Sequence, residues 1–205
     1  MTPASVSDTL ITELDAHACA AFIVAAFVLA GTAHVLWLRT RISRRFTFPL
    51  DGGHSLRGHR IFGDHKMIRG FMVMIPAAGV AFGLLFLLLR TTAPGVAARL
   101  WPLSPLDYCA LGLLAGLGFM AGELPNSFVK RRLGINPGAV PIHPVLRGIF
   151  LLADRVDSIA GMLLSLSLAV AVPAWTCVYV LIFGIGIHWI FSAVLFAFGV
   201  KERRA

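Results

Sequence analysis

Charged residues are scarce in this sequence, and their scarcity excludes most soluble folds. Only 14% of the 205 residues are Asp, Glu, Lys or Arg, whereas a soluble domain usually carries about a quarter. Cysteine is also rare: the three cysteines lie singly in apolar runs, and no pair has metal-ligand spacing. The cysteines therefore give no sign of a zinc site or a disulfide framework, and we expect them to be small packing residues.

Basic residues are absent from the first 38 positions. The segment before the first apolar run carries Asp8, Glu13 and Asp15 but no Lys or Arg. A secretory signal begins with a basic segment, so we expect the first run to be retained as a span. The net charge of +8 would suit a nucleic-acid-binding domain. However, no polar segment is long enough to fold alone, which argues against such a domain.

Long apolar runs dominate the sequence instead. Runs of about twenty residues can cross a bilayer core of roughly 30 Å as helices. We predict an all-α polytopic membrane protein, a single integral membrane domain over residues 1–205 with five transmembrane helices. The predicted spans cover residues 17–38, 71–89, 106–124, 159–172 and 175–200. The fourth is short, so a tilted or re-entrant helix remains open there.

The basic residues are distributed unequally between the two sides of the predicted membrane. Sixteen of the eighteen lie in residues 39–69, 130–155 and 201–204. Positive charge marks the cytoplasmic side, so the N-terminus is predicted outside and the C-terminus in the cytoplasm. Two cytoplasmic loops, about residues 39–70 and 125–158, then hold most of the reactive side chains, and we expect both to be functional.

The first loop combines glycine with basic residues. It contains five glycines, and backbone N–H groups that converge with cations are what a phosphate cradle needs. The candidate phosphate-binding residues of this loop are Asp51, Gly52, Gly53, Lys66 and Arg69. Ordinary turns have a similar composition, so a plain turn remains the alternative.

The second loop begins beneath the third span. If this stretch is helical, Glu123, Ser127, Lys130 and Arg131 share one face because they are three or four residues apart. A carboxylate, a hydroxyl and two cations would suit a metal-bound phosphate. A cluster of topology charges with an incidental glutamate is the alternative.

Two acidic residues precede the fourth predicted span. Asp154 and Asp157 are three apart, so both carboxylates face the same way on a helix. Hard oxygen ligands at this spacing suit Mg²⁺ that is shared with substrate phosphates. The alternative interpretation is a pair of acids favoured by the dipole at a helix N-terminus.

Four motifs together resemble the CDP-archaeol synthase family, which is related to the CDP-diacylglycerol synthases. They are PLDGG from Pro49, GDHKMIRG from Gly63, GELPNSFVKRRLG from Gly122 and DRVD from Asp154. The resemblance extends from about residue 45 to the C-terminus. The stretch SFVKRR followed by DRVD is its most specific part.

The resemblance implies a five-span membrane enzyme that transfers CMP from CTP to a lipid phosphate with Mg²⁺. Its partners would be CTP, a lipid phosphate and membrane lipid, without nucleic acid, and we expect a bacterial inner membrane with the site facing the cytoplasm. The implied catalytic residues are Lys66, Lys130, Asp154 and Asp157. The implied CTP-binding residues are Asp51, Gly52, Gly53, Lys66, Arg69, Ser127, Lys130 and Arg131, and the implied metal ligands are Asp154, Asp157 and Glu123.

Three departures indicate a divergent member of the family. The family usually has Gly-Asp where this chain has Gly122-Glu123, and Lys-Thr-Trp-Arg-Gly where this chain has Met67 and Ile68 in the middle. It usually has Asp-Gln-x-Asp where this chain has Arg155 after the first Asp. The first change lengthens an acid, the second removes a hydroxyl, and the third adds a cation beside the proposed metal ligands.

Three functions of other classes remain open. A CDP-alcohol phosphotransferase would need an Ala-Arg and further aspartates after Asp51-Gly52, and only Asp64 follows in this loop. A non-catalytic scaffold of the same fold is a second alternative. A transporter is the third, because ionisable residues such as His34 and His188 lie within predicted spans.

Overall fold

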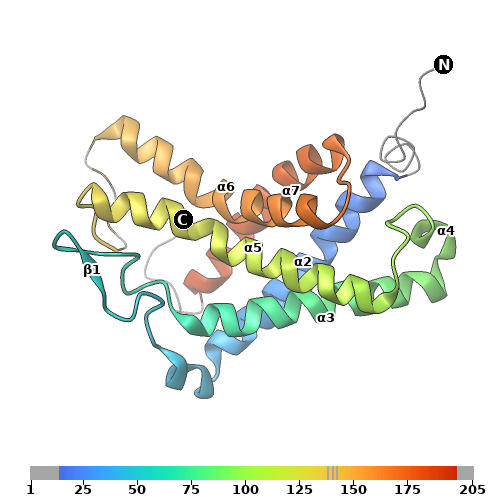
Figure 1. The fold of residues 1–205 in the computed structure, drawn as a ribbon, viewed down its shortest axis with the longest axis horizontal. Helices are drawn as coiled ribbons and strands as arrows, with labels where there is room; N and C mark the ends of the chain where they lie inside the picture. The colour runs from blue at the N-terminus through green and yellow to red at the C-terminus, as the bar shows by residue number, and fades with distance from the viewer. Residues whose placement is uncertain (1–13, 138, 140, 142, 198–205) are drawn as a thin grey trace.

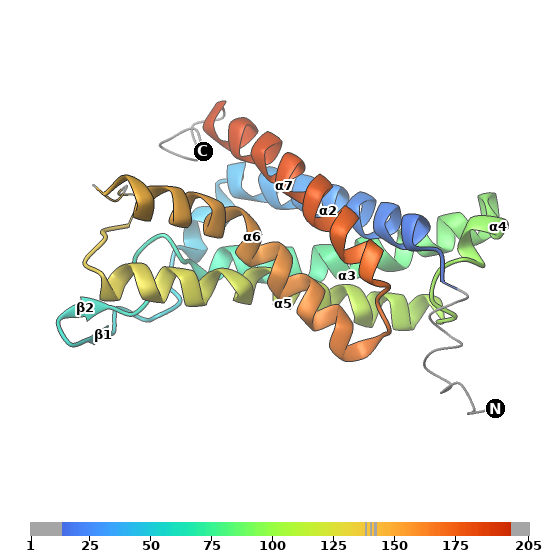
Figure 2. The same ribbon diagram turned by 90° about the horizontal axis from the view of Figure 1, so that it is seen from above.

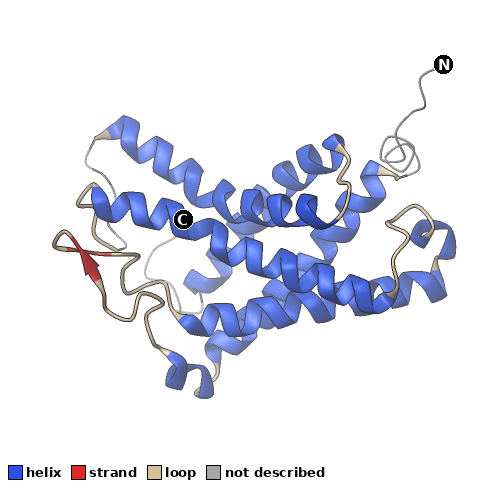
Figure 3. Ribbon diagram, in the orientation of Figure 1, coloured by secondary structure: helices blue, strands red, loops and turns tan. Residues whose placement is uncertain are grey.

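Five long helices form most of the protein (Figure 1). The computed structural model describes residues 14–137, 139, 141 and 143–197. In chain order the elements are α2 (Ala16–Arg39), η1 (Ile42–Phe46), β1 (Ser55–Leu56), β2 (His59–Arg60), α3 (Ile68–Thr92), α4 (Pro94–Ala97), α5 (Pro105–Arg132), α6 (Pro144–Ala169) and α7 (Ala174–Ala197). The two short strands form one antiparallel hairpin, the only sheet in the described residues (Figure 3). The predicted helical class is therefore confirmed.

Four of these helices are long and apolar enough to cross a membrane: α2, α3, α5 and, over Ala174–Val194, α7. They correspond to the first, second, third and fifth predicted spans. Residues 198–200 of the fifth prediction lie outside the described residues. Helix α6 is about as long as the others, but it carries four charged residues between Arg147 and Asp157. The count of five spans therefore remains a prediction.

The predicted end of the fourth span is wrong, whereas the bounds of the second cytoplasmic loop remain a prediction. Helix α6 ends at Ala169, where Val170 has extended backbone angles, so no helix continues to residue 172. Helix α5 runs on through Pro125 to Arg132, and α6 begins at Pro144. Most of the predicted loop is therefore helical. Pro125 and several charged residues lower the hydropathy of this stretch, but they do not end a helix that packs against its neighbours.

The functional motifs lie at one end of the bundle. The β1–β2 hairpin and the connection from α5 to α6 lie together there, whereas α4 and the turn from α6 to α7 lie toward the other end (Figures 1 and 2). The end of α2 leads into the hairpin segment, and the end of α7 lies on the same side. The first two basic segments, residues 39–69 and 130–155, therefore lie at this end, and residues 201–204 of the third lie outside the described residues.

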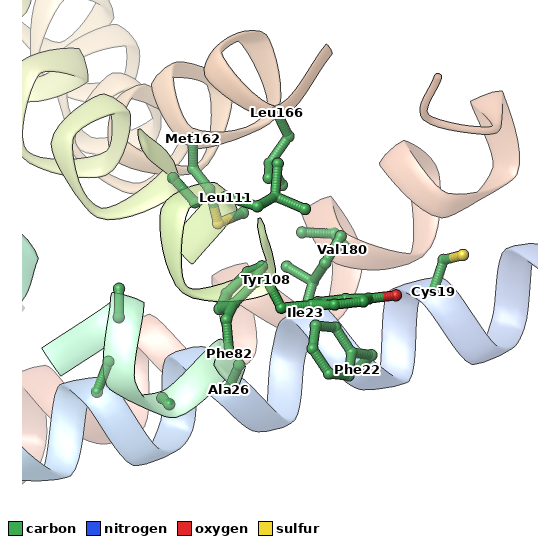
Figure 4. Packing of buried hydrophobic residues seen from close by; sticks show 14 of the residues in the cluster. Cys19, Phe22, Ile23, Ala26, Phe82, Tyr108, Leu111, Met162, Leu166 and Val180 are labelled. Atoms are coloured by element: carbon green, nitrogen blue, oxygen red, sulfur yellow. The ribbon is translucent and has the colours of Figure 1, made fainter. Parts of the chain in front are cut away.

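A core of buried apolar side chains, aromatic ones among them, lies away from the loops (Figure 4). Tyr108 is fully buried, stacks on Phe86 at a centroid distance of 3.9 Å and meets Phe22 edge-on. Its hydroxyl donates to the carbonyl oxygen of Trp101 at 2.8 Å, so the buried polar atom is satisfied. This packed core fixes α2, α3 and α5 against one another.

Glycines let the helix backbones approach closely at two crossings. A side chain at Gly112 would overlap the carbonyl oxygen of Ala78, so α3 and α5 touch there. A side chain at Gly122 would overlap the carbonyl oxygen of Asp157, so α5 and α6 touch there as well. Small residues of this kind let membrane helices approach and pack. The second crossing brings the charged parts of α5 and α6 together.

Candidate active site

Two aspartates of α6 meet one asparagine of α5. The Nδ2 atom of Asn126 donates to Oδ1 of Asp154 at 2.7 Å and to Oδ2 of Asp157 at 2.9 Å. One amide group therefore holds both carboxylates toward a common point. The close approach at Gly122, one turn earlier on α5, makes this contact sterically available.

Two lysines pair with the acidic residues from different parts of the sequence. Lys130, on α5, donates to Oδ1 of Asp154. Lys66, just before α3, donates to Oε2 of Glu123. The hydroxyl of Ser158, which is fully buried, donates to Oε1 of Glu123 at 2.8 Å. Residues far apart in the sequence thus form one cluster, which we call the acid–lysine cluster: Lys66, Glu123, Asn126, Lys130, Asp154, Asp157 and Ser158.

The first loop is organised around Asp51. Both carboxylate oxygens are engaged: Oδ1 accepts from the Gly53 backbone and from Arg60, and Oδ2 accepts from Arg60 and from the backbone N–H groups of Phe62 and Gly63. Burial acts to raise the pKa of Asp51, but Arg60 and these N–H groups outweigh it and hold the pKa well below its usual range. Asp51 therefore stabilises the loop.

The two predicted cradle glycines serve the same loop. Gly52 and Gly53 have φ angles of 56° and 87°, which favour glycine, and their N–H groups donate to Pro49 and to Asp51. These N–H groups are already hydrogen-bonded, so the structure does not support the prediction that they bind phosphate. Direct contact between Asp51 and a nucleotide also lacks support, because its oxygens are taken.

The basic residues at the end of α5 divide between two roles. Arg132 donates to the carbonyl oxygens of Leu56, His59 and Arg60, and so holds the hairpin. Arg131 is 8% exposed and packs beside Gly63, and its Nε and Nη1 atoms have no hydrogen-bond partner among the described residues. A buried cation with unused donors is suited to an anionic ligand.

The remaining two predicted residues lie close to this cluster along the chain. Ser127, half-buried, follows Asn126 on α5, and Arg69, also half-buried, lies in the first turn of α3, three residues after Lys66. Both positions are compatible with the predicted contacts to phosphate, which remain predictions.

The two aspartates fit a divalent cation that a substrate also binds. Asp154 and Asp157 converge on one atom of Asn126, and two carboxylates plus substrate phosphates are a usual ligand set for Mg²⁺. The described residues contain no group of three His, Cys, Asp or Glu side chains that could hold a metal alone. Glu123 is paired with Lys66 and Ser158, and its predicted role as a third metal ligand remains a prediction.

An apolar cavity of about 190 Å³ lies beside the acid–lysine cluster. It is lined by residues of α2, α3, α5, α6 and α7, among them Ile23, Phe27 and Val180. Its polar residues are His34, Glu123 and Ser192, each near the end of its helix on the side of the two loops. The cavity therefore has an apolar body and a polar end that includes a member of the cluster.

Comparison with known proteins identifies the family. A sequence model described as CarS-like CDP-archaeol synthase matches residues 45–204. The CDP-archaeol synthase of Halobacterium salinarum is 35% identical over 76% of this chain and 82% of its own length. The chain belongs to the CarS-like CDP-archaeol synthase family. The CDP-archaeol synthase of Methanopyrus kandleri is 34% identical over 75% of this chain and 78% of that relative.

A solved structure supports the same assignment to the CarS-like family. It is described as an intramembrane enzyme for archaeal membrane lipids biosynthesis, and it covers 80% of this chain and 88% of its own with 27% identity and a TM-score of 0.50. The resemblance inferred from the motifs, the membrane enzyme class and the integral membrane location are confirmed at the level of the family. The named relatives are archaeal, so they give no support to a bacterial inner membrane.

Sequence reasoning missed three residues of the acid–lysine cluster and its supports. Asn126 and Ser158 lie within or next to the motifs, but neither was assigned a role. Gly122 was quoted only as the residue before Glu123. Each acts across the α5–α6 crossing, so a pattern on one helix could not reveal it. The adjacency of Asn126 to the charged face of α5 was the one available signal.

Proposed function

We propose that this protein transfers CMP from CTP to a lipid phosphate, giving a CDP-lipid and pyrophosphate. The observation that carries this proposal is the acid–lysine cluster at the polar end of an apolar cavity. Such a site combines groups for binding phosphates with space for a hydrocarbon chain. Membership of the CarS-like family supports the reaction class.

The proposed reaction needs positioning and charge neutralisation more than acid–base chemistry. An oxygen of the lipid phosphate attacks the α-phosphorus of CTP, and the bond to the bridging oxygen breaks as pyrophosphate leaves. The nucleophile is already ionised at neutral pH, so no strong general base is required. Catalysis then depends on holding the two phosphates in line and on stabilising the charge that develops.

The residues of the cluster have separate proposed roles. Asp154 and Asp157, oriented by Asn126, would hold Mg²⁺, and the bound ion would neutralise charge on the nucleotide phosphates. Lys66 and Lys130 would bind phosphate oxygens in place of their present carboxylate partners. Arg131 has two unused donors near the first loop, which makes it a candidate for binding the triphosphate.

The lipid substrate is proposed from the cavity and from the relatives. An ether lipid phosphate of archaeal type is favoured over a phosphatidate-like ester, because both named relatives are synthases of CDP-archaeol. The apolar cavity would take part of a hydrocarbon chain, and its polar end would face the lipid phosphate.

We propose that the site faces the cytoplasm. Residues 39–69 and 130–155 hold thirteen of the eighteen basic residues, eight and five respectively, and both segments lie at the end that bears the acid–lysine cluster. Positive charge marks the cytoplasmic side of a membrane protein. In a variant without native cysteines, a cysteine at Thr92 should react with an impermeant thiol reagent in intact cells, and one at Arg57 should not. The reverse labelling pattern would overturn this orientation.

The function is tested by an assay of the purified protein in detergent with labelled CTP and Mg²⁺. Ether-linked and ester-linked lipid phosphates are offered separately, and the matching lipid alcohols are the controls. We expect a CDP-lipid from a lipid phosphate and none from the alcohols. If neither lipid phosphate is converted and CTP does not stabilise the protein against heat, the chain is a non-catalytic member of the family.

A further inference from the structure

Arg155 is a buried cation whose guanidinium is only partly hydrogen-bonded. It lies on α6 between the two aspartates, and it is 6% exposed. Nη1 donates to the carbonyl oxygen of Leu151 at 2.9 Å, but Nε and Nη2 have no hydrogen-bond partner among the described residues. Its charge is not paired with a carboxylate in that part of the chain either. Such an arrangement is costly unless an anion completes it.

The surroundings of Arg155 fix the guanidinium in place. Its central carbon lies 4.7 Å from the centroid of the Trp189 ring on α7, a cation–π contact. The neighbouring acids are engaged elsewhere: Asp154 binds Lys130 and Asn126, and Asp157 binds Asn126 and Ser158. Arg155 is therefore held between α6 and α7 rather than within the acid–lysine cluster.

The position of Arg155 relates it to the apolar cavity. Arg155, Ile159 and Met162 are spaced i, i+4 and i+7, so they lie along one face of α6. Ile159 and Met162 line the cavity. Arg155 is one turn nearer the α5–α6 connection, which is also the side of the cavity's polar residues Glu123 and Ser192. Arg155 therefore extends the cavity-lining face of α6 toward the polar end of the cavity.

We propose that Arg155 binds the phosphate monoester of the lipid substrate whose chain occupies the cavity. This inference rests on the proposed function for the identity of the lipid phosphate. The unused Nε and Nη2 atoms are suited to two phosphate oxygens, because a guanidinium binds phosphate through paired N–H groups. Arg155 is then a lipid-specific contact, and Lys66 and Lys130 serve the nucleotide.

The test compares Arg155→Gln with wild type in two measurements. In steady-state kinetics, Arg155→Gln should raise the KM for lipid phosphate about tenfold or more and leave the KM for CTP nearly unchanged. In thermal unfolding without CTP, a short-chain lipid phosphate should stabilise wild type but not Arg155→Gln. Arg155→Lys, which keeps the charge, should restore part of both effects.

Two controls separate the sources of binding. Arg147→Gln removes an exposed cation from the same helix and should behave like wild type in both measurements. The uncharged lipid alcohol and inorganic phosphate, each at the same concentration, should not stabilise wild type. Stabilisation by inorganic phosphate equal to that by lipid phosphate would overturn the lipid assignment.

Other outcomes also decide the inference. If Arg155→Gln keeps the wild-type KM and stabilisation, or if only its KM for CTP rises, Arg155 does not bind the lipid phosphate. If wild type forms no CDP-lipid, the proposed function fails, but the thermal measurement still decides whether Arg155 binds a lipid phosphate. If Arg155→Gln does not fold, Arg155→Lys must show an intermediate KM for lipid phosphate, and a wild-type KM would overturn the inference.

Discussion

The two ends of the helix bundle differ in how completely their polar side chains are hydrogen-bonded. At the end without the loops, Tyr108 donates to Trp101, the indole of Trp101 donates to Ala171 at 2.8 Å, and Ser104 and Asp107 form a capping box at the start of α5. At the other end, Lys66 pairs with Glu123 and Lys130 pairs with Asp154. Two buried arginines there have donor atoms without a hydrogen-bond partner among the described residues. The polar side chains named at the first end are hydrogen-bonded within the protein, whereas the second end has donor atoms that a ligand could bind.

This contrast distinguishes polar groups that stabilise the fold from polar groups that bind a ligand. A buried hydroxyl or indole that meets a carbonyl oxygen stabilises the fold and requires nothing more. A buried guanidinium without a partner destabilises the free protein and is retained where a ligand completes it. If the contrast is correct, equivalent substitutions at the two ends should have different consequences.

The largest difference should appear for the acids. Asp154→Asn and Asp157→Asn should each reduce CMP transfer about a hundredfold or more, because each removes a ligand and a charge that face the phosphates. Both proteins should still insert and purify. Asp107→Asn, at the other end, should weaken only the helix cap and leave turnover near normal. Near-normal turnover of both site variants at limiting Mg²⁺ would reduce Asp154 and Asp157 to structural residues.

The lysines should show the next largest difference. Lys66→Ala and Lys130→Ala should weaken CTP binding, since a bond to an ionised phosphate contributes about 1.5–3 kcal/mol, roughly ten- to a hundredfold in affinity. Thermal stabilisation by CTP with Mg²⁺ measures this. Arg99→Ala and Arg44→Ala remove cations outside the site, and they should respond to CTP like wild type. Equal responses in all four variants would contradict a nucleotide site at the two lysines.

The smallest difference should come from the glycines. Gly122→Ala and Gly112→Ala both introduce a methyl group against a carbonyl oxygen, so each should destabilise the protein by about 1–3 kcal/mol. Only Gly122→Ala should also lower turnover per folded molecule, roughly tenfold, because it moves α6 with its aspartates. Gly148→Ala, which meets nothing within 4 Å, is the neutral control on α6. Equal turnover per folded molecule in Gly112→Ala and Gly122→Ala would contradict a specific role of the Gly122 crossing in placing the aspartates.

Much of the fold could be predicted from hydropathy and charge. Four apolar runs match four helices, because a span needs length and apolar composition, which one sequence displays directly. The extension of α5 past Pro125 could not be read in this way. Proline reduces helix propensity locally, but the helix continues where packing against α6 compensates for the lost hydrogen bond.

The charged residues of the candidate site could be predicted from the sequence, but the residues that they contact could not. The spacing of Asp154 and Asp157 on one face correctly indicated that both carboxylates point the same way. The pairing of Lys66 with Glu123, 57 residues apart, depends on how α3 packs on α5. The loop-stabilising contacts of Asp51 could not be predicted for a related reason: its five hydrogen bonds come from residues that only the folded loop brings near.

The central claim is that the acid–lysine cluster transfers CMP to a lipid phosphate, and the fate of the phosphorus atoms of CTP tests it most directly. The purified protein is incubated with Mg²⁺, a lipid phosphate and CTP labelled either at the α-phosphorus or at the γ-phosphorus. We expect α-label in the lipid extract and γ-label in aqueous pyrophosphate. Transfer of γ-label to the lipid, or no label in the lipid from either CTP, would contradict it.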